Sequence, residues 1–204
     1  VVLPNSLAQV NSYLETFCFH GFILSGGNDI NPQQLGNSSI NGLSISEKRD
    51  QVESAILKFA IDRKVPVLGI CRGMQFINAH FGGDIQFNIN SSASSSEALV
   101  GRRIFHAPTF GNSSEHLVIL DKDLCGRDEA LVNSYHNHGL KKEDISKELN
   151  IFAQSPDGVI EGIYHPNYPI AGIQWHPERK SPDEIFNAQL INGFIERGLF
   201  WREK

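Results

Sequence analysis

The chain has 204 residues, 40% of them hydrophobic, and this composition suits one compact α/β domain spanning residues 1–204. Acidic residues outnumber basic ones by 23 to 18, the formal net charge is −5, and no long basic run occurs; a nucleic-acid partner is therefore excluded and a small molecule is the expected ligand. No stretch approaches the ~18 apolar residues that span a bilayer, and no charged signal-peptide segment opens the chain, so we expect a cytoplasmic protein without a membrane partner.

Cysteine usage indicates a reducing compartment. The three cysteines, Cys18, Cys71 and Cys125, are widely separated and odd in number. This pattern matches neither a disulfide framework nor the C-x-x-C spacing of a metal site. We therefore expect free thiols and no bound metal.

The first half of the chain alternates helical and strand-like segments. In chain order we expect a helix at 7–17, a buried strand at 21–24, a glycine turn at 25–27, a polar loop at 31–46 and a helix that opens at 46. Residues 65–70 then form a continuous apolar run of strand length, and residues 74–81 have a helical pattern. The last two segments predict a strand, a sharp turn and a helix.

Short strands dominate the second half, followed by one last helix. The strands are expected at 116–120, 131–134, 150–154, 159–164 and 170–175, and the helix at about 183–197. Alternating strands and helices followed by strands in succession predict an α/β fold with a central, mostly parallel sheet and helices on both faces. Sites in such sheets form at the carboxyl ends of strands, where the glycine turns after Leu24 and Ile70 both fall.

The segment Gly69-Ile70-Cys71-Arg72-Gly73 has the G-x-nucleophile-x-G form. In that form the central residue occupies a strained strand-to-helix turn, and the flanking glycines avoid clashes. The N-terminus of the following helix favours a thiolate, the reactive form of cysteine. The alternative is a buried structural cysteine beside a glycine at the start of a helix.

A catalytic thiol also needs a base and a group that orients the base. His176 and Glu178 follow the predicted strand at 170–175, and residues two apart in an extended segment point to the same side. The carboxylate of Glu178 can then select the tautomer of the imidazole. Taken alone, His-Pro-Glu is as well explained by a solvent-facing loop, and only its combination with the Cys71 turn favours catalysis.

An oxyanion that develops in such a reaction needs N–H donors aimed at it. The backbone N–H of Arg72, directly after the nucleophile, is one candidate, and Gly27 in the turn after Leu24 is the second. The segment Ser25–Asp29 is a weak signal by itself, because glycine turns are common chain reversals.

Three motifs together resemble the class I glutamine amidotransferase superfamily, whose fold is flavodoxin-like. They are Ser25–Ile30, Gly69–Gln75 and Gln174–Glu178, in this order and spacing. Within the superfamily the chain is most similar to the stand-alone γ-glutamyl hydrolases of peptidase family C26, the group of γ-glutamyl-γ-aminobutyrate hydrolase. This closer resemblance is carried by Arg72, by Arg49-Asp50-x-x-Glu53 and by Val132–His136.

The resemblance implies a Cys-His-Glu triad that works through a glutamyl thioester, with no metal or organic cofactor. Cys71 is implied as the nucleophile, His176 as the general base and acid, and Glu178 as the group that orients it. Gly27 and Arg72 are implied as the oxyanion donors. The residues expected to hold the glutamyl head group of the substrate are Gln75, Asn133, Ser134, Tyr135 and His136.

The other histidines are less specific. His136 lies at a strand end, where a hydrogen-bonded structural role is an equal alternative, and His106 lies in a segment that family members often place against the site. No ligand spacing connects the rest, so surface or core positions are expected for His20, His80, His116, His138 and His165.

The favoured interpretation is a hydrolase that cleaves the γ-glutamyl amide of a small amine-containing metabolite. One alternative is a glutaminase subunit that delivers ammonia to a separate synthetase, and another is a non-catalytic binding protein on the same fold. The amine and the oligomeric state stay open, a homodimer being one option. The family normally begins with a strand before the residues that match 2–5, so we expect the N-terminal strand of the fold to be missing here.

Overall fold

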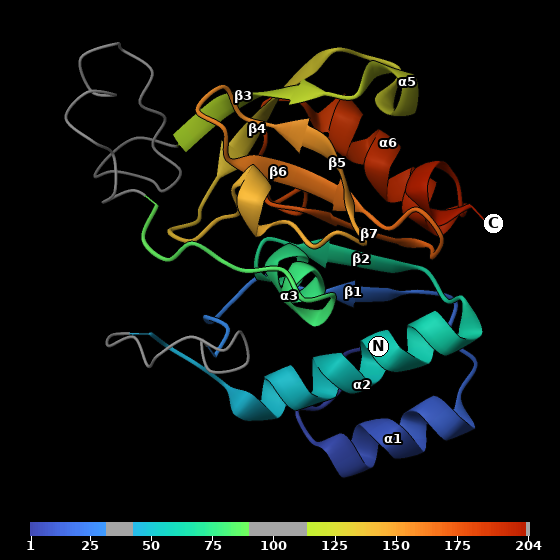
Figure 1. The fold of residues 1–204 in the computed structure, drawn as a ribbon. Coiled ribbons are helices and arrows are strands. Elements are labelled where there is room, and N and C mark those ends of the chain that lie inside the picture. The colour runs from blue at the N-terminus through green and yellow to red at the C-terminus, as the bar shows by residue number, and fades with distance from the viewer. Residues whose placement is uncertain (32–42, 90–113, 203–204) are drawn as a thin grey trace.

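The computed structural model describes residues 1–31, 43–89 and 114–202. Within these residues one seven-stranded sheet crosses the molecule in the order β1-β2-β7-β6-β5-β3-β4 (Figure 1). The strands are β1 (Phe22–Leu24), β2 (Val67–Ile70), β3 (Ser114–Leu120), β4 (Glu129–Ser134), β5 (Asn150–Gln154), β6 (Ile160–Tyr164) and β7 (Ile170–Ile173). Each strand expected from the sequence is present, with ends that differ by a few residues.

The expectation of a mostly parallel sheet is only partly met. β1 pairs with β2 and β2 pairs with β7 in parallel, whereas the pairings of β7 with β6, β6 with β5, β5 with β3 and β3 with β4 are antiparallel. The connections after β5 and β6 are short, and antiparallel neighbours are the strands that such connections can join. The sheet is therefore parallel at the end that carries β1 and β2 and antiparallel in the rest.

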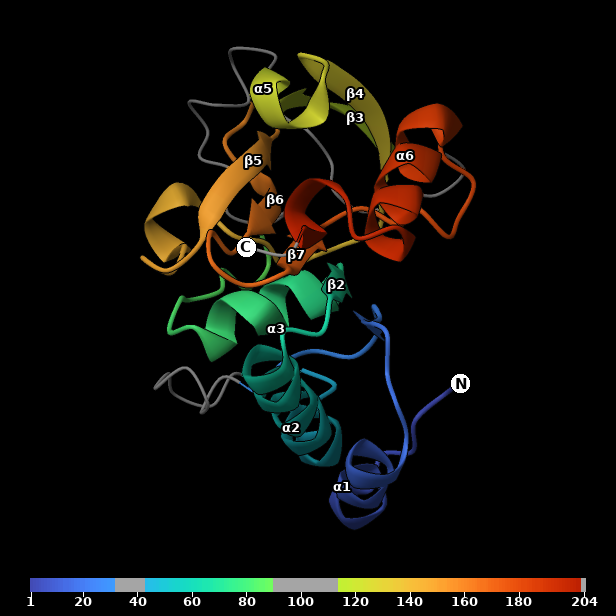
Figure 2. The same cartoon turned by 90° about the vertical axis from the view of Figure 1, so that its right-hand side faces the viewer.

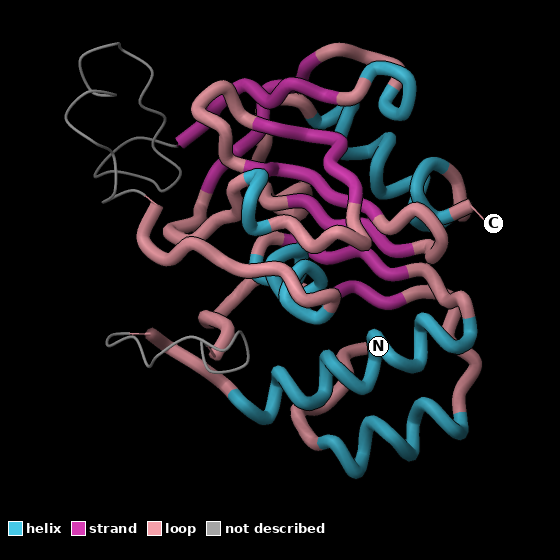
Figure 3. The backbone as a smooth tube through the Cα atoms, viewed as in Figure 1, coloured by secondary structure: helices cyan, strands magenta, loops and turns pink. Residues whose placement is uncertain are grey.

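Helices lie on both faces of the sheet, as expected. They are α1 (Leu7–Thr16), α2 (Glu47–Arg63), α3 (Arg72–His80), α5 (Lys122–Cys125) and α6 (Glu184–Ile195), with short 3₁₀ helices η2 (Lys142–Asp144) and η3 (Leu199–Trp201). In Figure 2, α3 and α6 lie on opposite sides of β2 and β7. The tube in Figure 3 shows α2 and then α1 as two long helices beneath the sheet, and α1 packs on α2.

Two apolar clusters hold these layers together, one on each face. Val67 enters the cluster shared with α1, α2 and α3, whereas its neighbour Leu68 enters the cluster shared with α6 and η3. Successive side chains of a strand point to opposite faces, so a strand covered on both faces is apolar throughout. Burial on both faces explains why residues 65–70 form an uninterrupted apolar run. It also places the end of β2 in the interior of the molecule.

Local signals set the helix ends. α2 ends at Arg63 and is capped by Lys64, whose φ of 53° is left-handed. α6 begins after Asp183, whose carboxylate accepts a hydrogen bond from the N–H of Phe186. Among the described residues, none of the helices is both long and apolar enough to cross a bilayer.

Candidate active site

Cys71 lies in the turn that joins β2 directly to α3. Its φ and ψ of 52° and −105° are unusual for a residue with a side chain, and this strain is typical of a nucleophile turn. Two backbone bonds hold the turn, because the N–H of Cys71 donates to the carbonyl of Ile173 at 2.7 Å and its own carbonyl accepts from the N–H of Gln75 at 3.2 Å. The sulfur-bearing residue is thus fixed between β7 and the first turn of α3.

The flanking glycines are required by close packing. A Cβ atom at Gly69 would lie 2.6 Å from the carbonyl carbon of Gly73, and a Cβ atom at Gly73 would collide with the carbonyl oxygen of Leu24. Backbone therefore lies against backbone where α3 crosses β2 and β1. This packing brings the Cys71 turn next to the segment that follows β1.

His176 and Glu178 form the second part of the site. Nδ1 of His176 lies 2.6 Å from Oε1 of Glu178, the imidazole is buried, and the carboxylate side chain is 51% exposed. Burial is the largest single influence and acts to raise the pKa of Glu178. Hydrogen bonds from His176 and from the backbone, together with the positive charges of His176 and Arg179, outweigh it jointly, and the net pKa is lowered. The carboxylate therefore holds the proton on Nδ1 and leaves Nε2 of His176 free to accept one.

The turn after β1 lies against both of these residues. A Cβ atom at Gly26 would lie 2.9 Å from Cε1 of His176 and 3.6 Å from Cβ of Cys71. One point in space is therefore in contact distance of the cysteine and of the histidine, and only glycine fits there. Gly27, the expected second oxyanion donor, follows with a φ of 144°, a conformation that side chains rarely adopt.

The Cys71 sulfur has two polar neighbours. Nε2 of Gln174 donates to it at 3.5 Å, and the N–H of Arg72 donates a hydrogen bond that lowers its pKa. Burial nevertheless raises the pKa of the Cys71 thiol to about 11. The N–H at the start of α3 therefore favours the thiolate, as expected, but burial has the larger effect on the pKa.

Gln174 was not predicted as a site residue, although its position carries a signal. It lies two residues before His176 at the end of the strand predicted at 170–175, and alternation in a strand predicts both side chains on the same side. Gln75 supports it, because Nε2 of Gln75 donates to Oε1 of Gln174 and to the carbonyl of His138, both at 3.1 Å. The buried amide of Gln75 thus holds Gln174 in place, and its expected contact with substrate stays a prediction.

Asn133 is also committed to the protein backbone. Its Oδ1 accepts from the N–H of His176 at 2.9 Å, and its Nδ2 donates to the carbonyls of His176 and Lys180 at 2.8 and 3.1 Å. Asn133 therefore anchors the His-Pro-Glu turn to the end of β4. These bonds position the candidate base, and the substrate binding that the resemblance implies for Asn133 stays a prediction.

The other residues of the 133–136 segment differ in their surroundings. The ring of Tyr135 stands edge-on to His176, with centroids 5.7 Å apart, and the guanidinium of Arg179 lies 4.5 Å from the centroid of the same ring. Ser134 is fully buried. Besides Asn133, Tyr135 is thus the member of this segment whose side chain the structure brings against the candidate triad.

His136 belongs to a buried polar group behind the site. Its Nδ1 lies 2.9 Å from the carbonyl oxygen of His138, and its Nε2 lies 3.6 Å from Oε1 of Glu161, which is also 3.2 Å from Nε2 of His116. All three of these ionisable side chains are buried. This favours the structural alternative for His136, and His106 lies outside the described residues.

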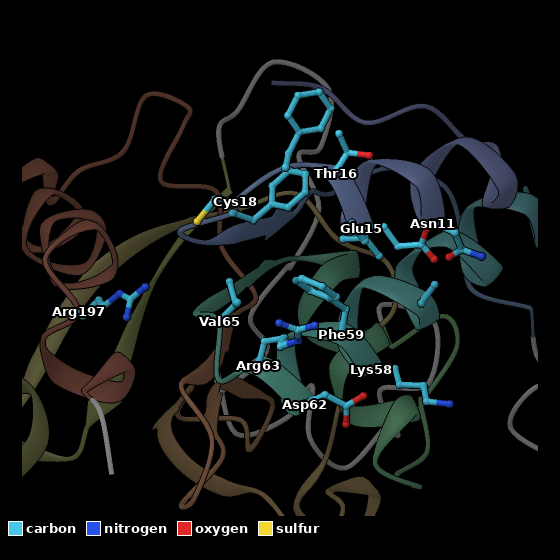
Figure 4. A pocket seen from close by; sticks show the side chains of 14 residues that line it. Asn11, Glu15, Thr16, Cys18, Lys58, Phe59, Asp62, Arg63, Val65 and Arg197 are labelled. Carbon is cyan, nitrogen blue, oxygen red and sulfur yellow. The ribbon is translucent and has the colours of Figure 1, made fainter.

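A separate cavity of about 760 Å³ opens near the ends of α1 and α2 (Figure 4). Its lining includes Cys18, Phe59 and Arg197 and none of the predicted site residues. The candidate site is therefore defined by its side chains and not by this cavity.

Solved structures share this fold. A Thermoplasma acidophilum protein described as a subunit of GMP synthase has a TM-score of 0.62 and 22% identity, over 96% of this chain and 80% of that chain. A glutamine amidotransferase of Thermotoga maritima has a TM-score of 0.55 and 14% identity, over 87% of this chain and 69% of that chain. At these identities the likeness shows the fold alone, which is that of the class I glutamine amidotransferases.

Sequence comparison defines the class more closely. The peptidase C26 family model matches residues 1–178. The γ-glutamyl-γ-aminobutyrate hydrolase of Escherichia coli strain K12 is 30% identical over 205 residues, which cover 96% of this chain and 78% of that protein. A Schizosaccharomyces pombe protein named for glutamine amidotransferase is 32% identical over 191 residues, which cover 90% of this chain and 71% of its own. The chain belongs to the peptidase C26 family and is a glutamine-amidotransferase-like hydrolase.

Proposed function

We propose that the protein hydrolyses the γ-glutamyl amide of a small amine-containing metabolite, with Cys71 as the nucleophile. The observation that carries this proposal is the convergence of three groups. Cys71 in its strained turn and His176 both lie against Gly26, and Oε1 of Glu178 lies 2.6 Å from Nδ1 of His176. A thiol, a base and a group that orients the base are the parts that nucleophilic acyl transfer needs.

The first half of the reaction forms a thioester. Nε2 of His176 takes the proton of the Cys71 thiol as the sulfur attacks the γ-carbonyl carbon, and the carbonyl oxygen becomes an oxyanion that the N–H groups of Arg72 and Gly27 stabilise. The tetrahedral intermediate then collapses, the carbon–nitrogen bond breaks, and the leaving amine takes the proton from His176. The product is a glutamyl thioester on Cys71.

The second half restores the enzyme. His176 takes a proton from a water molecule, whose oxygen attacks the thioester carbonyl carbon, and the carbon–sulfur bond breaks. The departing sulfur takes the proton back as free glutamate leaves. Glu178 stays ionised throughout and stabilises His176 as imidazolium, and the cycle uses no redox change and no phosphate group.

The substrate class is supported by the family and by the named relatives. The Escherichia coli relative is named for the hydrolysis of γ-glutamyl-γ-aminobutyrate, and the identity of 30% supports the γ-glutamyl amide but not a particular amine. A second candidate function is a glutaminase subunit that passes ammonia to a synthetase. It is favoured by the Schizosaccharomyces pombe relative, whose name is that of a glutamine amidotransferase.

The test compares γ- and α-glutamyl amides of one amine in the presence of a chelator, with release of free glutamate as the measurement. We expect turnover of the γ-linked compound alone, because a site that hydrogen-bonds the α-amino and α-carboxylate groups loses buried partners when they are displaced. Equal turnover of both linkages, or loss of activity on chelation, would contradict the proposal. Ammonia release from glutamine that appears only with a synthetase partner would favour the second function.

Cysteine dependence is tested by trapping. A glutamine-like diazoketone should form one adduct, on Cys71, because the bound reagent reaches both the thiol and His176. Cys125 is buried with a pKa raised to about 11, and exposed Cys18 lies at the separate cavity, so both should react slowly. The Cys71→Ala variant should show no adduct by mass spectrometry and no release of free glutamate. Preferential labelling of Cys18 or Cys125 would contradict the assignment.

A further inference from the structure

Four charged side chains, three of them buried and Arg49 14% exposed, lie between α2 and the Cys71 turn. The Arg72 side chain, 2% exposed, forms ion pairs with the carboxylates of Asp50 and Glu53, and Arg49 is paired with Glu53 at 2.7 Å. Two positive and two negative charges balance each other, which a buried charged group requires. The Glu53 carboxylate joins the two arginines, because Oε1 accepts from Arg49 and Oε2 accepts from Arg72.

The remaining nitrogens of Arg49 bind the turn after β1. Nη2 donates to the carbonyl of Ser25 at 2.6 Å, and Nη1 donates to the carbonyl of Gly26 at 3.2 Å and to Oδ1 of Asn28 at 3.1 Å. The planar guanidinium therefore holds the turn at several points. Lysine has a single nitrogen and cannot reproduce this arrangement.

The bond to the Gly26 carbonyl also determines where the next N–H points. In a planar trans peptide the C=O and the N–H point in opposite directions. Because the carbonyl of Gly26 faces Arg49, the N–H of Gly27 faces away from Arg49. A Cβ atom at Gly27 would lie 2.5 Å from Nη1 of Arg49, so the guanidinium lies directly against this glycine.

We propose that Arg49 and Glu53 are positioning residues that hold the two oxyanion donors in a fixed relation. The chain of contacts runs from Arg72, whose own N–H is one donor, through Glu53 and Arg49 to the peptide that carries the Gly27 N–H, the other donor. This inference rests on the proposed function, since an oxyanion forms only if Cys71 attacks a carbonyl group. Neither Arg49 nor Glu53 takes part in bond making.

The test separates oxyanion stabilisation from general support of the site. Alkylation of Cys71 by iodoacetamide forms no oxyanion, whereas hydrolysis of a γ-glutamyl amide does. In Arg49→Lys we expect kcat for hydrolysis to fall about 100-fold with little change in KM, because loss of one oxyanion donor has an effect of this size. The rate of Cys71 alkylation should stay within about twofold of the unchanged protein, since the thiol and His176 are untouched.

The matched control is Arg63→Lys in the last turn of the same helix. The Arg63 guanidinium lies over the ring of Phe59, 5.7 Å from its centroid, and is remote from the triad, so both rates should be unchanged. Glu53→Gln is a second variant of nearly the same shape, and it should show the same split between hydrolysis and alkylation. It covers the case in which Arg49→Lys does not fold.

Amide hydrogen exchange of the segment 22–30 gives a measurement that needs no substrate. Exchange should become faster in Arg49→Lys and stay unchanged in Arg63→Lys. If the protein without any substitution hydrolyses none of the γ-glutamyl amides, the proposed function fails. Faster amide exchange in Arg49→Lys would still show that Arg49 holds the turn. Equal loss of hydrolysis and alkylation, unchanged hydrolysis, or unchanged exchange would each overturn the positioning role.

Discussion

The side-chain amide of Asn133 is bound on both sides to the backbone of His176. Its oxygen accepts from the N–H of His176 and its nitrogen donates to the carbonyl of the same residue, at 2.9 and 2.8 Å. An asparagine at the end of β4 therefore determines where the candidate base lies, although 43 residues separate the two in the chain.

Asn133→Asp should distinguish the hydrogen bonding of this side chain from its contribution to packing. Aspartate has the same shape but cannot donate to the carbonyls of His176 and Lys180, so we expect a loss of roughly 2–4 kcal/mol in the free energy of unfolding and a large fall in kcat. Urea denaturation and steady-state kinetics measure the two effects. The control Asn150→Asp alters an exposed residue and should leave both values nearly unchanged; a fully active and stable Asn133→Asp protein would show that the anchor is dispensable.

Glu178→Gln should preserve the packing of the triad and remove its charge. The imidazolium that forms on His176 then lacks a counter-ion, so we expect kcat to fall on the order of 10²–10⁴-fold, less than in Cys71→Ala. The double variant should be no slower than Cys71→Ala alone, because members of a triad act as a unit. Steady-state kinetics of the three variants test this, and an unimpaired Glu178→Gln protein would make Glu178 a bystander.

The resting state of Cys71 can be read from the pH dependence of its alkylation. Its pKa is raised from 9.0 to about 11, so the neutral thiol persists through neutral pH and the thiolate fraction grows with pH up to that value. The rate of reaction with iodoacetamide should rise about tenfold per pH unit between about pH 7 and 10. Peptide mapping assigns the modified cysteine, and a rate that levels off near neutral pH would indicate a thiolate–imidazolium pair instead.

Gly26→Ala should abolish activity while the protein stays folded. The added methyl group would lie 2.9 Å from Cε1 of His176, which must move away from Cys71. We expect a loss of kcat of at least about 100-fold, since small misplacements of reacting groups have effects of this size. The control is Gly198→Ala, where the atom nearest to the added Cβ lies 3.7 Å away and φ is −93°. Normal activity of Gly26→Ala would mean that the turn after β1 moves to make room for the methyl group.

The candidate triad could be placed from the sequence because each member follows a recognisable strand end. Cys71 lies between an apolar run and a helical pattern, and His176 and Glu178 follow another apolar run with a spacing of two. The antiparallel part of the sheet could also be predicted from the sequence, because the short connections 155–159 and 165–169 leave no room for a crossover helix. These lengths explain why the mostly parallel sheet that we expected is only partly matched.

Side-chain hydrogen bonds between distant segments could not be predicted in this way. Asn133 and Gln75 were expected to contact substrate because they belong to matching motifs, but their amides bind His176, Lys180, Gln174 and His138. Which partner an amide selects depends on the packing of the whole fold. Arg49 and Glu53 belong to a sequence motif, and only the three-dimensional structure connects them with the turn that contains Gly27.

The buried, protonated thiol of Cys71 also bears on how the protein withstands oxidants. Peroxides oxidise thiolates to sulfenic acid and then to acids that most cells cannot reduce, whereas neutral thiols react slowly. With a pKa of about 11, the proposed nucleophile would be shielded while no substrate is bound, and in the proposed reaction it becomes nucleophilic only when His176 accepts its proton. The same burial that makes Cys71 slow at rest therefore lengthens the time for which an idle molecule keeps its capacity to react.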